Sequence, residues 1–203
     1  MKKYLIIVVL LVMAFPGSAL AQKAAVKTNL LYWATTTPNA GVEVRLADRY
    51  TLNLEGGYNP FTLDGSKEAN KKIKHFLISP EVRYWFCEAF NGHFVGINGN
   101  YSQFNVSAVG IPEIFYSLSN PKGMIGMDKD TRNEGWAAGA GITYGYQWIL
   151  GRRLNLEATL GLGYWYTEYD EFDNRKCGMF QQSHSRHLLG ITKCGISLVY
   201  LIK

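Results

Sequence analysis

The sequence predicts an all-β protein, an eight-stranded antiparallel up-and-down transmembrane β-barrel with short periplasmic turns and longer extracellular loops. Three observations predict this fold class. Apolar and polar residues alternate with a period of two in segment after segment. The apolar faces begin and end in aromatic residues, and the opposite faces carry glycine, amide, hydroxyl and charged groups. A soluble barrel would have an apolar interior, so this pattern favours an outer-membrane barrel.

The segment from Glu134 to Tyr169 has the clearest alternation and predicts a long β-hairpin. Its two halves are separated by a tight turn at Gly151-Arg152-Arg153. The predicted outward face of the first half consists of Trp136, Ala138, Ala140, Ile142, Tyr144, Tyr146, Trp148 and Leu150, and that of the second half consists of Leu154, Leu156, Ala158, Leu160, Leu162, Tyr164 and Tyr166.

The N-terminus has the features of a secretory signal peptide. Lys2 and Lys3 precede an apolar run, and the small-x-small sequence Ala19-Leu20-Ala21 predicts cleavage before Gln22. The apolar run is too short for a transmembrane helix, and no cysteine follows Ala21 to carry a lipid anchor. We therefore expect residues 1–21 to be a signal peptide and residues 22–203 to form the barrel in the outer membrane.

Six further segments alternate in the same way, although Pro80 interrupts one of them and the segment beginning at His93 is the least regular. In order they are Val26–Ala34, Ala40–Leu46, Tyr50–Asn59, His75–Phe86, His93–Phe104 and His187–Lys203. In the first of them, Tyr32 is predicted to face outward and Trp33 inward. The three longest connections all fall on the predicted extracellular side; they are Pro60–Lys72, Asn105–Asn133 and Asp170–Arg186. The turns at Ala47–Arg49, Cys87–Gly92 and Gly151–Arg153 fall on the other side.

This topology gives each aromatic residue a height in the wall, and two aromatic girdles result. The outer girdle contains Tyr32, Tyr58, Phe76, Tyr101, Trp136, Tyr164 and Tyr166, and the inner girdle contains Tyr50, Tyr84, Phe86, Tyr146, Trp148 and Tyr200.

Charges of both signs face the predicted interior, which is just wide enough for side chains to fill. They are Lys27, Glu43, Arg45, Glu55, Glu81, Arg83, Glu157 and Lys193. Unpaired charges there would be costly, so we expect a paired structural plug rather than a diffusion pore. A proton path or a catalytic carboxylate pair is the alternative interpretation.

Composition excludes some partners and cofactors. The formal net charge of +5 falls to +3 when Lys2 and Lys3 leave with the signal peptide, so we expect outer-membrane lipid and lipopolysaccharide as partners and no nucleic acid. Cys87, Cys177 and Cys194 are predicted to be unpaired thiols, with Cys194 a small apolar wall residue. No metal site and no cofactor are predicted.

Enzymatic activity remains an open alternative. Small outer-membrane barrels include lipid-modifying enzymes, which need a nucleophile and a base at the outer rim. The weak catalytic candidates are Ser183, His184 and His187, with Ser185 and His75 nearby. Because the sequence has no signature such as a nucleophile elbow, we interpret these residues as solvated, and we do not predict catalysis.

The connection Asn105–Asn133 is too apolar for a freely solvated loop. It either folds over the barrel mouth or docks another protein. The binding candidates are Ile111, Ile114, Phe115, Tyr116, Met124 and Ile125. Basic residues near the same rim would neutralise lipopolysaccharide phosphates; these are Lys67, Lys71, Lys72, Lys74, Arg175, Lys176 and Arg186.

Four stretches resemble an uncharacterised family, a domain of unknown function, of outer-membrane barrel proteins from Bacteroides-like bacteria. They are Lys27–Tyr32, Gly56–Pro60, Glu81–Cys87 and Gly145–Gly151. Some members of that family are encoded beside components of surface fimbriae, so the resemblance implies an envelope location and a fimbria-associated role. It implies no catalytic residues.

The leading hypothesis is therefore a non-enzymatic outer-membrane barrel that anchors or docks a cell-surface partner through its outer loops. The alternative is an outer-membrane lipid-modifying enzyme that transfers or removes acyl chains with the rim histidine and serine residues.

Overall fold

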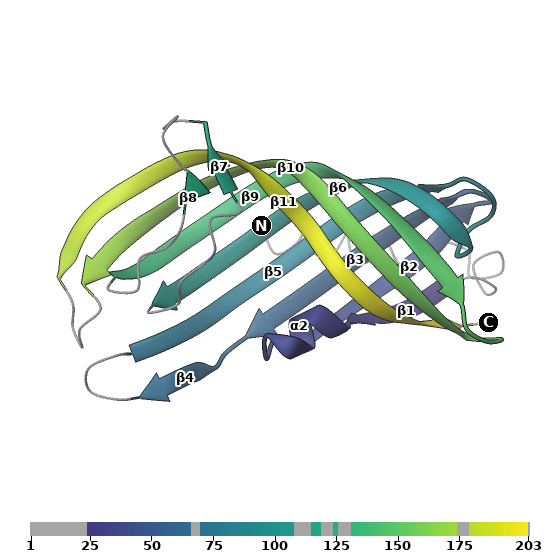
Figure 1. Ribbon diagram of the computed structural model, residues 1–203, viewed down its shortest axis with the longest axis horizontal. Helices are drawn as coiled ribbons and strands as arrows, with labels where there is room; N and C mark the ends of the chain where they lie inside the picture. Colours follow the sequence, from purple (N-terminus) through teal and green to yellow (C-terminus); the bar gives the residue numbers. More distant parts are fainter. Residues whose placement is uncertain are drawn as a thin grey trace, which may run out of the picture.

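The chain forms an all-β structure, seen in a computed structural model that describes residues 24–65, 70–107, 115–118, 124–125, 131–173 and 179–202. Eight strands follow one another in an antiparallel sheet, and pairing of the first with the last closes the sheet into a ring (Figure 1). They are β1 (Ala24–Asn29), β2 (Asn39–Ala47), β3 (Tyr50–Asn59), β5 (Asn70–Trp85), β6 (Gly92–Ser107), β9 (Thr131–Ile149), β10 (Leu154–Asp173) and β11 (Phe180–Ile202). Their meandering order agrees with the sequence prediction.

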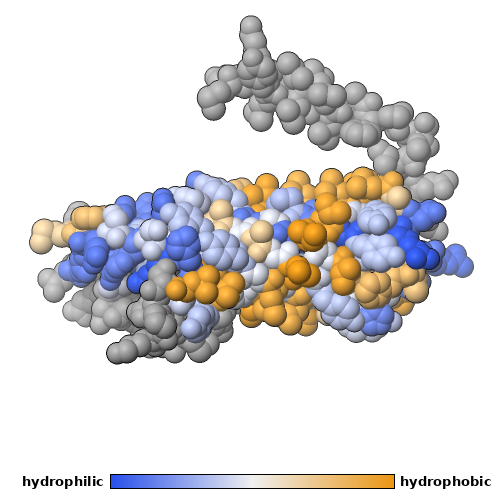
Figure 2. Space-filling view, turned by 90° about the horizontal axis from the view of Figure 1, so that it is seen from above, coloured by the Kyte–Doolittle hydropathy of each residue, from blue (hydrophilic) through white to orange (hydrophobic). Residues whose placement is uncertain are grey.

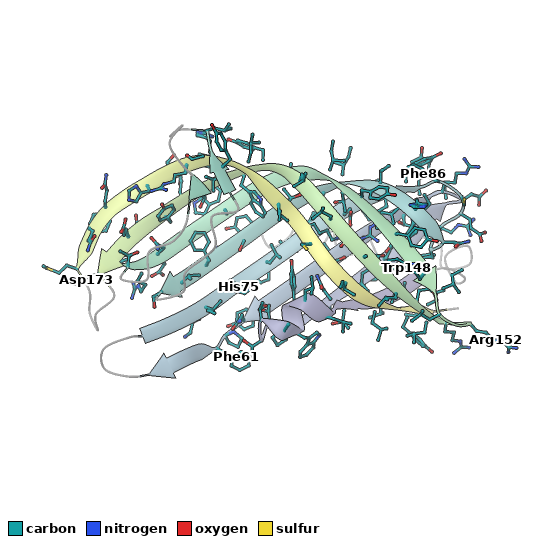
Figure 3. All side chains as sticks on the ribbon, viewed as in Figure 1. Phe61, His75, Phe86, Trp148, Arg152 and Asp173 are labelled. Carbon is teal, nitrogen blue, oxygen red and sulfur yellow. The ribbon has the colours of Figure 1, made fainter. Side chains whose placement is uncertain are left out.

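Short elements decorate this ring. β4 (Thr62–Gly65) pairs with β5, β7 (Phe115–Ser117) pairs with β11, and β8 (Met124–Ile125) pairs with β7. We call the end of the ring that contains the turns at Gly151 and Cys87 the turn end, and the opposite end the loop end. Phe86, Trp148 and Arg152 lie toward the turn end and Asp173 lies at the loop end (Figure 3).

The predicted hairpin is present. Its ladder runs from Asn155 opposite Ile149 to Asp173 opposite Thr131. Thr143 and Glu157 of its polar faces are fully buried, whereas Ile142 is 69% and Leu162 60% exposed. The period of two thus assigned the faces of this hairpin correctly, and the wall is apolar outside and polar inside.

The prediction of a strand over Val26–Ala34 was wrong beyond Asn29. β1 ends there, and Leu30–Ala34 forms the short helix α2. The Asn29 side chain accepts a hydrogen bond from Leu31 N at 3.0 Å, as an N-cap does. Leu30 to Trp33 are apolar on both faces, so this stretch carries no alternation that would distinguish a strand from a helix.

The strands also extend further toward the loop end than predicted. Most of the predicted loop Asp170–Arg186 is strand, because β10 runs to Asp173 and β11 begins at Phe180. Part of Pro60–Lys72 is strand as well, in β4 and the start of β5. Polar residues occupy both faces of these extensions, so hydrophobic alternation could not reveal them.

Two irregularities adjust the wall. β5 continues through Pro80, but its ladder with β6 has no paired residues at Ser79 and Pro80, as expected where proline removes a donor. In β11 the register against β10 passes from Lys193 to Ile191, and this bulge turns both Thr192 and Lys193 into the interior.

Candidate functional site

The middle of the ring is filled by ion pairs. Arg83 is fully buried and donates to three carboxylates, those of Glu43 at 3.0 Å, Glu81 at 2.8 Å and Glu157 at 2.8 Å. Lys27 Nζ lies 2.5 Å from Glu43 and 3.2 Å from Glu157. These groups come from β1, β2, β5 and β10, so their contacts cross the interior and tie distant parts of the wall together.

Lys193 completes this ion cluster. The bulge in β11 brings its Nζ to 2.9 Å from Glu55 and 2.7 Å from Glu81. The prediction of a paired interior is confirmed for seven of the eight charges. Arg45 is the exception, because a register shift at the end of β2 sends its guanidinium to Asp48 and to the carbonyl of Ala47.

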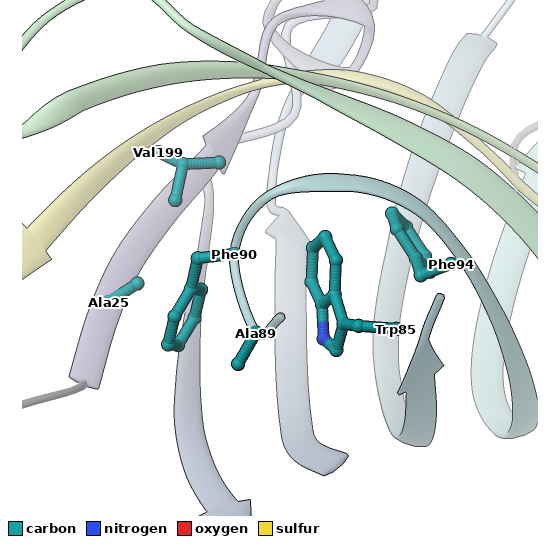
Figure 4. Close-up of a cluster of buried hydrophobic side chains, with 6 residues drawn as sticks. All are labelled: Ala25, Trp85, Ala89, Phe90, Phe94 and Val199. Carbon is teal, nitrogen blue, oxygen red and sulfur yellow. The ribbon is translucent and has the colours of Figure 1, made fainter. Parts of the chain in front are cut away.

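An apolar plug that the sequence did not predict closes the turn end (Figure 4). The turn between β5 and β6 carries Ala89 and Phe90 inward, against Trp85, Phe94 and Val199. The ring centroids of Trp85 and Phe94 are 4.7 Å apart, and Arg83 lies 4.3 Å from the Phe94 centroid. Plug and ion cluster therefore touch and fill successive layers of the lumen.

Backbone strain and close approach shape this plug. Phe90 has φ of 69°, a conformation that costs on the order of 1–3 kcal/mol and that burial of its ring offsets. A Cβ at Gly145 would meet Phe94 at 2.3 Å, so only glycine leaves room for that ring. The alternation assigned such positions to the inner face but could not say that an aromatic ring fills the space beside them.

The helix α2 seals the wall where β1 is short. Tyr32, predicted to face outward, instead lines a small interior cavity of about 10 Å³ together with Glu55, Ser79 and Lys193. Burial, with smaller contributions from Glu55 and Cys194, raises the pKa of Tyr32 to about 12. Trp33, predicted to face inward, is 52% exposed, and its Nε1 donates to Thr28.

The outer surface of the ring carries an apolar belt between the two groups of aromatic residues. Hydrophobic side chains gather over the middle of the visible face, and hydrophilic ones gather toward both ends (Figure 2). At one edge of the belt, Tyr58 of β3 lies opposite Phe76 of β5. At the other edge, the ring centroids of Tyr50 and Tyr84 are 5.3 Å apart. Apart from Tyr32, the girdle residues lie on the outward face as predicted.

The catalytic candidates lie on the loop-end extension of β11, but they do not form a nucleophile–base pair. Ser183 Oγ donates to Asp170 at 2.6 Å, and His184 Nε2 lies 3.0 Å from Glu171 Oε2. Ser183 and His184 are consecutive and therefore point to opposite faces of the strand. His187 faces outward and bonds through Nδ1 to the Tyr164 hydroxyl.

The binding candidates are described only in part. Tyr116 lies in β7 and is 47% exposed. Phe115 lies in β7, and Met124 and Ile125 form β8. Ile111 and Ile114 lie outside the described residues, as do Cys177 and the predicted signal peptide, residues 1–21. Cys87 and Cys194 are free thiols.

β7 marks the loop end of β11 as the candidate functional site. Ser117 pairs with Leu188 and Tyr116 with Leu189, although β7 lies between β6 and β9 in the chain. Sequence reasoning missed this pairing. It placed Arg186 among the basic rim residues but not its contact with Tyr169, whose ring centroid lies 5.5 Å from the guanidinium. The apolar character of Leu188 and Leu189 was the only available signal, and it did not specify a partner.

The part of the chain that the structure describes offers neither a metal centre nor a membrane-spanning helix. It holds no group of three or more His, Cys, Asp or Glu side chains that could bind a metal ion. It also holds no helix of the length and hydropathy needed to cross a membrane.

These features define a class: an all-β protein whose closed ring of eight antiparallel strands has an apolar exterior and an ion-paired interior. Residues 5–202 match the model of DUF3575, a family described as a protein of unknown function, so the chain belongs to this family. The resemblance to an uncharacterised family is thereby confirmed. No curated protein matches the chain.

Proposed function

We propose that the chain is an integral outer-membrane β-barrel that docks a cell-surface partner through its outer loops. The proposal that the chain lies in the outer membrane rests on the apolar belt of the ring's outer surface. Between the two girdles, the outward positions of the described strands hold no Asp, Glu, Lys or Arg, whereas the ion cluster faces inward. Water would favour the opposite arrangement, and a bilayer favours this one.

A transport pore fits the interior poorly. The ion cluster crosses the lumen at the middle of the ring and the plug fills its turn end. Both would have to be dismantled for a solute to pass, and removing one partner of a buried ion pair costs about 3–5 kcal/mol. The ring thus supports an anchoring role, with function at the loop end.

The docking part rests on the asymmetry of the loop end. β10 and β11 extend well past the belt, and β7 and β8 of the longest connection lie against β11. Tyr116 and Leu118 are both about half exposed there, and such exposed apolar residues on a projecting structure are typical of an interaction surface. A fimbrial component is the partner class that the family resemblance implies.

Membrane insertion is tested by heat-modifiable migration and by accessibility on intact cells. The folded chain should migrate differently before and after boiling in detergent, and a label attached at Gln181 should react on whole cells. A chain that fractionates without detergent and shows no boiling-dependent shift would contradict the membrane part of the proposal.

Docking is tested by deleting Gly110–Asp128 and comparing the surface-exposed proteins of the cells. The barrel should remain heat-modifiable while one surface protein or filament is lost. Replacing residues 66–69 of another predicted outer loop with a Gly-Ser linker is the matched control and should leave that protein in place. Unchanged surface proteins in the deletion variant would refute docking through this loop.

A lipid-modifying enzyme is the second candidate, favoured by one observation. His187 faces outward beside Tyr164 and Tyr166, in the girdle where lipid head groups would lie. This candidate predicts that the double variant His184→Ala, His187→Ala alters the acyl pattern of the outer-leaflet lipid. An unchanged lipid profile would remove it and leave docking.

A further inference from the structure

The two edges of β11 are used very differently. Along one edge, β10 pairs with it from Phe180 to Tyr200. Along the other edge, β1 pairs with it only from Ser197 to Ile202, because β1 ends at Asn29. Toward the loop end this second edge needs other partners for its backbone groups or remains open to solvent.

From Cys194 toward the loop end, backbone groups of β11 have other hydrogen-bond partners. The Cys194 carbonyl accepts from Asn29 Nδ2 at 3.1 Å, and the Ile191 carbonyl accepts from Trp165 Nε1 at 3.1 Å. β7 then pairs at Leu189 and Leu188, and the His187 carbonyl accepts from Leu118 N at 2.8 Å. Beyond His187, no other described segment pairs with this edge of residues 180–186, which we call the open edge.

The direction of the open edge's hydrogen-bonding groups follows from His187. In an antiparallel sheet the N–H and C=O of one residue point to the same side, and alternate residues point to opposite sides. Since the His187 carbonyl points toward β7, the backbone groups of Ser185 and Ser183 point the same way. Those of His184 and Arg186 point to β10.

The open edge has little of the usual protection. Exposed edges are normally blunted by several charged side chains, Pro or a covering element, because they otherwise accept a foreign strand. Residues 180–186 read Phe-Gln-Gln-Ser-His-Ser-Arg, contain neither Lys nor Pro, and carry Arg186 at one end as their only Arg or Lys. In the described part of the longest connection, only β7 pairs with β11, at Leu188 and Leu189, and β8 pairs with β7 instead.

We propose that the open edge is a β-strand addition site, at which an extended segment of the docked surface protein continues the strand position begun by β7. This inference rests on the proposed docking function and specifies how the surface protein binds. Backbone hydrogen bonds to Ser183 and Ser185 supply the affinity, and side chains supply specificity.

Arg186 indicates the chemistry of the incoming segment. Its guanidinium lies over the Tyr169 ring, and within the described ranges no carboxylate lies at salt-bridge distance from it. Glu171, an acidic residue of the same face, is paired with His184. The added strand therefore carries an acidic side chain beside Arg186, where a partly buried site strengthens the attraction.

Proline substitution at Ser185 tests this mode. It removes the N–H that points to the open edge and leaves the ladder with β10 intact, because that ladder uses His184 and Arg186. Ser185→Ala is the matched control, since it removes the hydroxyl and keeps the N–H. The probe is a benzophenone amino acid at position 181, photoactivated on intact cells that make the native surface proteins.

Strand addition predicts one cross-linked surface protein in the parent chain, an adduct yield within about twofold in Ser185→Ala, and a yield about tenfold lower in Ser185→Pro. Equal yields in the two variants, or no protein adduct in the parent, would overturn it. Both variants must retain the heat-modifiable shift. If Ser185→Pro does not, Ser183→Pro removes the next donor on the same edge and repeats the test.

The outcomes separate the mode from the function. If deletion of Gly110–Asp128 abolishes the adduct and Ser185→Pro does not, docking stands and strand addition is refuted. If the surface protein persists on cells in both, the proposed docking function fails as well.

Discussion

The closed part of the ring and its loop-end extension are built from the same strands but satisfy their chemistry differently. Within the ring every strand has two neighbours, and the fully buried Arg83 donates hydrogen bonds to three carboxylates. In the extension, β11 has one complete neighbour, and its pairs, such as Ser183 with Asp170, are exposed. Closure removes strand edges, and where closure stops the same alternation leaves an edge that another chain can use.

The largest expected effect is on stability: a buried ion pair of the ring should contribute much more to the free energy of unfolding than an exposed ion pair. Arg83→Met leaves the four carboxylates of the ion cluster with two cations, so we expect a loss of about 3–5 kcal/mol in the free energy of unfolding. Arg45→Met is the control, because Arg45 pairs with the exposed Asp48, and should cost less than about 1 kcal/mol. Urea unfolding in lipid vesicles measures both, and equal losses would show that the cluster is no more important than a surface pair.

The belt provides the second comparison. Ile142 is 69% exposed at the middle of β9, where a bilayer would cover it. Ile142→Arg should destabilise the protein by roughly 2–4 kcal/mol in vesicles. Glu134→Arg, beyond the girdle on the same strand, should cost far less. A tolerated arginine at position 142 would mean that this face meets water.

The seal between the two regions can be tested by pH. Since burial raises the pKa of Tyr32 to about 12, the folded chain keeps this proton when the unfolded chain, near pH 10, has lost it. The contribution of Tyr32 is thus complete below pH 10 and is lost as pH rises toward 12, by at most about 1.4 kcal/mol per pH unit. Tyr32→Phe should show a smaller drop in urea midpoint between pH 9 and pH 11, and an identical drop would place Tyr32 in water.

The smallest effect is expected in the extension. His184 and Glu171 form a partly exposed pair, so His184→Ala should change the free energy of unfolding by less than about 1 kcal/mol. Glu171→Ala should behave alike, and the double variant should show little coupling. A coupling energy as large as that of the Arg83 pairs would mean that the extension is as rigid as the ring.

Sequence patterns predicted the ring well because its walls obey a local rule. Ile142 and Thr143 are neighbours whose opposite environments follow from a period of two, and the same holds for Leu162 and Gly161. Lys27, Glu43, Glu81 and Glu157 were placed inside by the same count. The sequence predicted that these charges would be paired, but it did not predict which residue pairs with which, because the partners depend on how the strands stagger.

The features that the sequence did not predict correctly share a physical cause. Leu30–Trp33 has no alternation, and Phe180–Arg186 is polar on both faces, so neither stretch carries a period to read. Phe90 lies in a turn, and only the tertiary structure shows that this turn enters the lumen. The outer binding candidates were read from apolar character, which does not specify a neighbour.

By itself, the sequence determined which residues face the wall's two sides, where most strands run and that the interior charges must be paired. Those properties depend on residues close together in the chain. The tertiary structure decided that Arg83 meets Glu157 across the lumen, that the bulge at Thr192 brings Lys193 to Glu81, and that β7 lies on β11. These contacts join residues far apart in sequence, and ring closure, stagger and the short β1 fix them together.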